Sequence, residues 1–210
     1  VIRRHRIRVA RAQIPFVIGG WGTRGKSGTE RKKAALFEGL GYHVTSKTTG
    51  CEAMMIHARP GQEGVELPIY RPGDKATIWE QGKVVEWAGK FKSQVFLWEC
   101  MALGEDYAAT LQHDWMNDDL STLSNTFVDH ENVQGPTGMD VSRALTSFVP
   151  EKGTLFTAEE FMLPVIREKC KSRSTKLFDL KWHESDLIGD DVLSLFPYTV
   201  HPRNIGMVLK

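Results

Sequence analysis

The sequence predicts an α/β domain with a P-loop and a mostly parallel, doubly wound sheet, covered on both faces by helices in three α/β/α layers. Three observations predict this fold class. Short apolar runs alternate with amphipathic stretches along most of the 210 residues. Residues 14–46 have the strand–helix–strand order of a βαβ unit, which normally gives parallel strands. A glycine-rich turn that ends in Lys-Ser joins the first strand to the helix.

The first half of the chain gives four expected strands and two expected helices. Apolar residues recur at helical spacing over 26–40, where Gly41 is a natural stop, and again from residue 78 onward. Residues 51–77 are rich in glycine, proline and charge, so we expect a long loop with one short strand there. The expected strands are 14–19, 42–46, 66–70 and 95–99.

The second half continues the alternation. Thr157 and Glu160 have the spacing of a capping box, so we expect a helix of about a dozen residues there, kinked at Pro164. Residues 204–210 are expected to begin a further helix. The other expected elements are a helix at 138–148 and strands at 120–126, 154–157, 175–180 and 196–200.

The strongest motif is Gly20-Trp-Gly-Thr-Arg-Gly25-Lys26-Ser27, which satisfies the pattern G-x4-G-K-[ST]. Backbone N–H groups of such a turn and the helix N-terminus form a cradle for phosphate. Lys26 can reach the β- and γ-phosphates, and the Ser27 hydroxyl can hold Mg²⁺. The alternative is a plain glycine turn with an exposed lysine, but a strand before and a helix after favour the phosphate site.

Polar side chains follow two further strands. Glu99 comes directly after the apolar run VFLW, and Asn125, Asp129 and His130 follow the next expected strand. The carboxyl ends of parallel strands meet at one edge of the sheet, where ligands bind. Mg²⁺ takes oxygen ligands in octahedral geometry, so Glu99 is the candidate that suits it best. The spacing alone leaves open whether His130 faces a metal or phosphate or is an ordinary loop residue.

Five motifs together resemble the Mur-ligase superfamily: GTRGKS (22–27), KTTG (47–50), WECMAL (98–103), DHENVQGPTG (129–138) and HPRN (201–204). Within it, the chain is most similar to the ATP-dependent amide ligase subunits of poly-γ-glutamate (capsule) synthases. Peptidoglycan Mur ligases usually carry Asn and Lys-Thr where this chain has Arg24 and Lys26-Ser27. The resemblance runs in the same order from about residue 10 to residue 210.

The resemblance implies ATP and Mg²⁺ as cofactors and a role for each matched residue. Thr48 and Thr49 would lie on the side of the carboxylate substrate, and Asn204 would approach adenine. Lys26, Glu99 and His130 would be catalytic. The implied magnesium ligands are Ser27, Glu99 and His130, and the implied phosphate-binding residues are Gly22, Thr23, Arg24, Gly25, Lys26 and Ser27.

Two departures from the family pattern bear on the metal. Many Mur ligases use a carbamylated lysine between the Glu and Asp-His motifs, but residues 100–128 contain no lysine. Either this branch binds metal without it, or an aspartate substitutes; the candidates are Asp114, Asp118 and Asp119. The chain also has Asn132 where many relatives have Asp.

The function implied is an ATP-dependent carboxylate–amine ligase that activates a carboxylate as an acyl-phosphate. Its expected substrates are glutamate and a γ-glutamyl chain. Alternatives are a peptidoglycan Mur ligase, a folylpoly-γ-glutamate synthetase, and a non-catalytic ATP-binding or scaffold module. A small kinase or GTPase is a further alternative, although the chain has no guanine-reading Asn-Lys-x-Asp and such a protein leaves KTTG and DHENVQG unexplained.

Charge and cysteine usage bear on organisation and compartment. The net charge of +1 hides five arginines and no acid in residues 1–13, so residues 14–210 sum to −4. We therefore expect a basic arm at 1–13, solvated or near anionic lipid, before an ATP-binding domain at 14–210. Three widely spaced cysteines suit a reducing cytoplasm.

The family resemblance implies the cytoplasmic face of the membrane, small integral-membrane synthase subunits as partners, a membrane anchor before Val1 and a C-terminal domain beyond residue 210. Self-association is left open, and no nucleic-acid partner is expected.

Overall fold

The computed structural model describes residues 2–50 and 52–210, so Val1 of the expected arm and Cys51 lie outside the described residues. Eight strands of the described part form one sheet: β1 (Phe16–Trp21), β2 (Val44–Thr48), β3 (Met54–Ala58), β4 (Val65–Pro68), β5 (Val95–Glu99), β6 (Leu120–Leu123), β7 (Thr154–Thr157) and β8 (Lys176–Asp179). Their order is β4-β3-β2-β5-β1-β6-β7-β8. From β2 to β8 in this order, neighbouring strands are parallel. On the other side of β2, β3 is antiparallel to β2 and β4 is antiparallel to β3.

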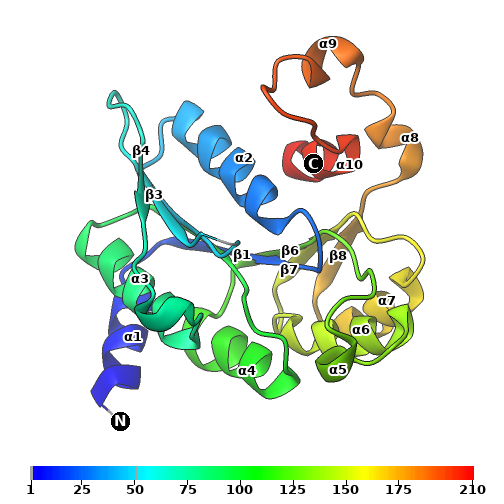
Figure 1. Cartoon of the computed structure of the whole chain (residues 1–210), viewed down its shortest axis with the longest axis horizontal. Coiled ribbons are helices and arrows are strands. Elements are labelled where there is room, and N and C mark those ends of the chain that lie inside the picture. Colours follow the sequence, from blue (N-terminus) through cyan, green and yellow to red (C-terminus); the bar gives the residue numbers. More distant parts are fainter. Residues whose placement is uncertain (1, 51) are drawn as a thin grey trace.

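Helices cover both faces of the sheet, which confirms the expected three-layer α/β/α architecture (Figure 1). One face carries α2 (Lys26–Gly39), α8 (Trp182–Ser185), α9 (Asp190–Leu193) and α10 (Pro202–Leu209). The other carries α1 (Ile2–Ala12), α3 (Ile78–Lys90), α4 (Glu105–Ala109), α5 (Glu131–Gln134), α6 (Gly138–Leu145) and α7 (Leu163–Ser172). No helix of the described residues is both long and apolar enough to span a bilayer.

Aromatic side chains fill the larger core, between the sheet and the layer that contains α3 and α6. Trp21 stacks on Phe148 at a centroid distance of 4.1 Å and meets Trp98 edge-on at 5.0 Å. Both indole N–H groups donate to the buried carboxylate of Asp118, and burial raises the pKa of this acid to about 6. Trp98 and Trp115 are also core residues and are at most 1% exposed.

The basic N-terminal segment differs from the expected arm. It forms α1, which packs against α3 and buries Ile7 completely. Four of its arginines find partners on the domain: Arg3 over the Trp79 ring, Arg6 with Glu86, Arg8 with Asp114 and Arg11 with Asp119. Acidic side chains of the domain thus offset much of the +5 charge, which is why the segment docks as a helix. Its place near a membrane stays a prediction.

Residues 51–77 contain an antiparallel hairpin: the short strand expected at 66–70 is found as β4 (Val65–Pro68), but β3 (Met54–Ala58) was not expected. β3 pairs with β2 and β4 pairs with β3, so the sheet extends by two strands on this side. The side chains of β4 are exposed, as suits an edge strand of the sheet. β2 also starts two residues later than expected and reaches Thr48.

Two expectations near the C-terminus are wrong. Thr157 and Glu160 do not cap a helix; α7 begins at Leu163, and Pro164 lies in its first turn, where a missing N–H costs nothing and no kink arises. Residues 196–200 are not a strand. Instead, the rings of Phe196 and Tyr198 lie about the Lys32 ammonium of α2, at 5.5 and 5.7 Å.

Glu30 and Lys33 form a buried ion pair in α2, and this pair predicts how the stability of the fold depends on pH. Glu30 of α2 is fully buried beside Lys33, and burial raises its pKa from 4.5 to about 7, against the lowering effect of the Lys33 charge. Folded Glu30 holds its proton to a higher pH than the unfolded chain does, so its contribution to stability is fully present below pH 4.5 and is lost as the pH rises through 7. We therefore expect the unfolding free energy of Glu30→Gln, measured with urea, to fall less between pH 4.5 and 7.5 than that of the unchanged chain. Glu38→Gln, at a more exposed position of the same helix, is the control, and an identical pH slope in Glu30→Gln would contradict the assignment.

Candidate active site

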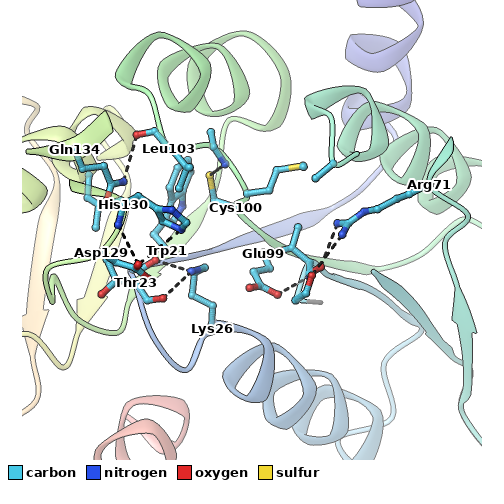
Figure 2. Close-up of a pocket in the computed structure, with 17 residues that line it drawn as sticks. Trp21, Thr23, Lys26, Arg71, Glu99, Cys100, Leu103, Asp129, His130 and Gln134 are labelled. Carbon is cyan, nitrogen blue, oxygen red and sulfur yellow. Dashed lines mark hydrogen bonds and ion pairs between the residues drawn. The ribbon is translucent and has the colours of Figure 1, made fainter. Parts of the chain in front are cut away.

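The candidate site lies where the strand order reverses, at the carboxyl ends of β1, β5 and β6. In doubly wound sheets this crevice is where ligands bind. A cavity of about 380 Å³ opens there, and it is lined by residues that follow different strands (Figure 2). They include Lys26 after β1, Thr49 after β2, Glu99 at the end of β5 and His130 after β6.

The glycine-rich turn is shaped by left-handed glycines and held by the chain after β6. Gly22 and Gly25 have φ of 125° and 80°. Asn125 accepts from the Thr23 hydroxyl at 2.7 Å and from the Arg24 N–H at 3.0 Å, and its amide donates to the Arg24 carbonyl. Asn125 therefore positions the turn. This is also why β6 stops at Leu123, short of the expected residue 126.

Lys26 lies at the centre of the cavity. Its ammonium donates to the carbonyl oxygens of Gly22 at 2.7 Å and Thr23 at 3.2 Å. Figure 2 shows it between Asp129 and His130 on one side and Glu99 on the other. Its two present acceptors are neutral carbonyls, so an anionic phosphate oxygen would compete well for this charge.

Ser27 and Glu99 come together as expected. The buried carboxylate of Glu99 accepts from the Ser27 hydroxyl and from the Thr49 N–H on the same oxygen, each at 2.7 Å. The Thr49 hydroxyl is buried and has no hydrogen-bond partner among the described residues. These oxygen donors fit Mg²⁺, which prefers carboxylate, hydroxyl and phosphate oxygens. Within the described residues no three His, Cys, Asp or Glu side chains gather as a ligand set, so the chain supplies only part of an octahedral shell.

His130 lies on the opposite wall of the cavity from Glu99 (Figure 2). Its side chain is 52% exposed, and its Nε2 is 3.9 Å from Asp129, which also pairs with Arg24 at 3.2 Å. The structure brings Ser27 and Glu99 into contact and places His130 across the cavity from them. Thr48 is buried at the end of β2 and does not line the cavity, whereas Thr49 does.

Arg71 is a residue of the cavity wall that the sequence motifs missed. Its guanidinium pairs with Glu80 of α3 at 2.6 and 3.1 Å and donates to the Thr49 carbonyl at 3.1 Å. Glu80 also lies 3.2 Å from the ammonium of the fully buried Lys47, whose pKa is lowered to about 8 by burial. This ion cluster fixes the loop that follows β2. Its partners lie far apart in sequence, so only the odd placement of a lysine inside a buried strand could have signalled it.

A second cavity, of about 370 Å³, adjoins the other side of the glycine-rich turn. Arg24, Gly25 and Asn204 line it together with the aromatic rings of Phe127, Phe161 and Trp182. Asn204 of α10 lies against Gly25, where its amide nitrogen would be 2.5 Å from an added Cβ. The aromatic lining suits a flat ring system.

The three aspartates considered as lysine substitutes lie elsewhere. Asp118 and Asp119 precede β6 and so lie at the opposite end of that strand from the cavity. Asp119 accepts from the Val17 N–H at the start of β1, and Asp114 faces Arg8 of α1. None of the three lines the cavity that holds Lys26 and Glu99.

Replacing Gly25 by alanine is expected to weaken nucleotide binding strongly and to destabilise the fold by about 1–2 kcal/mol, the cost of a left-handed conformation in a residue with a Cβ. The added methyl would also press on Asn204 at the junction of the two cavities. Nucleotide titration and thermal unfolding measure the two effects. Gly39→Ala is the matched control because a Cβ at this position of α2 meets nothing within 4 Å. Equal behaviour of the two variants would contradict the role given to the turn.

Comparison with known proteins extends the motif resemblance. No protein-family model matches the chain. It is 31% identical over 196 residues to the capsule biosynthesis protein CapB of Bacillus anthracis. The matched region covers 93% of this chain and 41% of that protein. It is 29% identical over 196 residues to the PGA synthase CapB of Bacillus subtilis (strain 168). Here the matched region covers 93% of this chain and 48% of that protein. The chain thus spans less than half the length of either relative, and the expected resemblance to this branch is confirmed.

Solved structures of similar fold include those of FolC and FPGS proteins. E. coli FolC in complex with DHPP and ADP matches with a TM-score of 0.59 and 17% identity over 84% of this chain and 46% of that one. The apo form of L. casei FPGS matches with a TM-score of 0.61 and 16% identity over 85% of this chain and 48% of that one. At these identities the comparison confirms the α/β fold.

Proposed function

The chain is a homologue of the CapB capsule-synthesis proteins, and from this premise we propose that it is the ATP-binding part of an ATP-dependent amide ligase that makes γ-linked glutamate polymers. The observation that carries the proposal is the contact of the Ser27 hydroxyl with the Glu99 carboxylate at 2.7 Å. It joins the P-loop helix to the end of β5 beside the cavity that Lys26 lines. ATP is the proposed nucleotide because related folds are named as complexes with ADP and AMPPCP.

The chemistry requires activation of a carboxylate, which is a poor electrophile because it is anionic and lacks a good leaving group. Attack of a carboxylate oxygen on the γ-phosphorus forms an acyl-phosphate and breaks the bond to ADP. An amine then attacks the acyl carbon, phosphate leaves with the bonding electrons, and the amine loses a proton, which gives an amide. Bound Mg²⁺ would neutralise charge on the phosphate oxygens during the transfer.

The position of each residue in the site suggests its role in this reaction. The Lys26 ammonium would move from the Gly22 and Thr23 carbonyls to the transferred phosphate and stabilise its charge. Ser27 and Glu99 would hold the metal. His130, from the far wall, would face the acyl-phosphate, and Thr49 with the buried Thr48 would border the carboxylate substrate. Asn204 and the aromatic cavity would receive adenine.

Glutamate and a γ-glutamyl chain are the proposed substrates, by analogy with the relative named a PGA synthase. We also propose that the protein acts with small integral-membrane synthase subunits and is located at the cytoplasmic face of the membrane.

The test supplies ATP, Mg²⁺ and glutamate to the full-length protein with its membrane partners and measures both phosphate release and polymer. Phosphate release that depends on glutamate, with polymer formed, is the expected result. A parallel reaction with a folate acceptor tests the folylpolyglutamate alternative, which the FolC-type fold raises. Turnover that ignores glutamate would contradict the ligase proposal, and binding of ATP without turnover would favour a scaffold role.

A further inference from the structure

Two histidines face each other at the end of β2 that is remote from the cavity. His43 immediately precedes β2, and His57 lies in β3, directly across from Thr45 in the antiparallel ladder. The Nε2 atoms of the two imidazoles are 3.4 Å apart, and the rings meet edge to face with centroids 4.9 Å apart. Both residues are half-buried, and neither has a part in the proposed ligase reaction.

We propose that His43 and His57 bind a divalent transition-metal ion such as Zn²⁺ between their Nε2 atoms. Two imidazole nitrogens bound to tetrahedral zinc, each about 2.0–2.1 Å from the ion, lie about 3.3–3.4 Å from each other. The observed separation of 3.4 Å is therefore the one that such an ion requires, without any rearrangement of the strands. Antiparallel pairing of β2 with β3 fixes the two backbones that carry the ligands.

The other nitrogen of the His57 ring is already engaged, which orients that ring. His57 Nδ1 is 3.1 Å from the Thr45 hydroxyl, which in turn is 2.7 Å from the hydroxyl of Ser93. His43 is held through its backbone, whose N–H donates to the Gln94 side-chain carbonyl at 2.9 Å. When Nδ1–H donates to such a partner, the Nε2 lone pair is left free, and this is the usual arrangement of histidines that bind metals. Thr45 and Ser93 are fully buried, so the orienting bonds are shielded from water.

The local charges favour neutral imidazoles, which is the form that binds metal. Burial and the nearby charge of Arg59 lower the pKa of both histidines. Arg59 follows β3 and also opposes a bound cation, so it should limit the affinity. Among the described residues no third His, Cys, Asp or Glu joins the pair, so water or a small exogenous ligand would complete the shell and the ion would exchange readily.

The test titrates the chain with ZnCl₂ in the presence of a saturating Mg²⁺ concentration and records imidazole nitrogen shifts by long-range ¹H–¹⁵N NMR together with calorimetry. We expect one ion per chain, with the Nε2 resonances of His43 and His57 shifting at the same ratio. His43→Gln or His57→Gln should each weaken zinc binding at least 10-fold, and Thr45→Val should weaken it less. Arg59→Gln should tighten it, because one opposing charge is removed. His5→Gln, on the exposed face of α1, is the matched control and should leave the titration unchanged.

The competing arrangement is a direct N–H···N hydrogen bond between the two rings. Zinc that leaves both Nε2 resonances in place, or that binds equally well to the His43→Gln and His57→Gln chains, would overturn the proposal. The NMR arm needs no variant, so a substitution that fails to fold does not prevent a decision. None of these measurements depends on ligase activity, so the metal site and the proposed function can fail separately.

Discussion

Replacing Lys26 by alanine is expected to reduce ATP turnover by at least about 100-fold, the loss typical when one preorganised charge is removed from a transition state. Lys26 is the cation at the centre of the cavity, and its present bonds to the Gly22 and Thr23 carbonyls are ones that a phosphate would replace. Alanine keeps the helical start of α2, so the turn itself should persist. Phosphate release in the full-length protein with its membrane partners is the measurement.

Lys32→Ala is the matched control for this change. Lys32 belongs to the same helix but lies outside the cavity, against the rings of Phe196 and Tyr198. Its loss should leave turnover within about twofold, because a surface side chain remote from the reaction contributes little to it. If Lys26→Ala kept normal turnover while the fold and nucleotide site were intact, phosphate chemistry at the P-loop would be excluded.

Strong local signals made much of the fold predictable from sequence. The strands 95–99 and 154–157 have the expected bounds, because each is a short apolar run between polar or glycine-containing segments. The segments that were missed lack such a signal. Strand β3 was not expected, and its pairing depends on the edge offered by β2. The helical stretch 105–116 passes from α-helix to π-helix, a change that depends on tertiary packing rather than on a sequence period.

The candidate site was predictable where its residues follow strand ends in recognisable motifs. Ser27 and Glu99 are such residues, and the structure joins them. Glu159 shows the limit: it belongs to none of the motifs, yet it is 4% exposed and accepts from the Thr126 N–H and hydroxyl. Its partner lies 33 residues away, and a pairing between two loops leaves no periodic trace in the sequence. Arg71 and Glu80 escaped notice because a pair between a loop residue and a helix residue nine positions later follows no sequence period.

Glu99→Gln is expected to separate metal dependence from nucleotide binding. One oxygen of Glu99 accepts both hydrogen bonds, from Ser27 and from the Thr49 N–H, so the single oxygen of glutamine can keep both. The substitution therefore removes the negative charge and the second oxygen with little change in packing. Turnover should fall about 100-fold or more, because charge on the transferred phosphoryl group would no longer be neutralised by a well-held Mg²⁺.

Binding of ATP without metal should move in the opposite direction to turnover in this variant. A buried carboxylate beside the phosphates repels them, so Glu99→Gln should bind metal-free ATP as well as the unchanged chain or more tightly. Addition of Mg²⁺ should then strengthen binding less than it does in the unchanged chain. Titration of a fluorescent ATP analogue with and without Mg²⁺ measures both effects, and Glu105→Gln, outside the cavity lining, is the control. An unaltered response to Mg²⁺ in Glu99→Gln would show that the metal is held by other groups, and the partnership of Ser27 with Glu99 would then be structural.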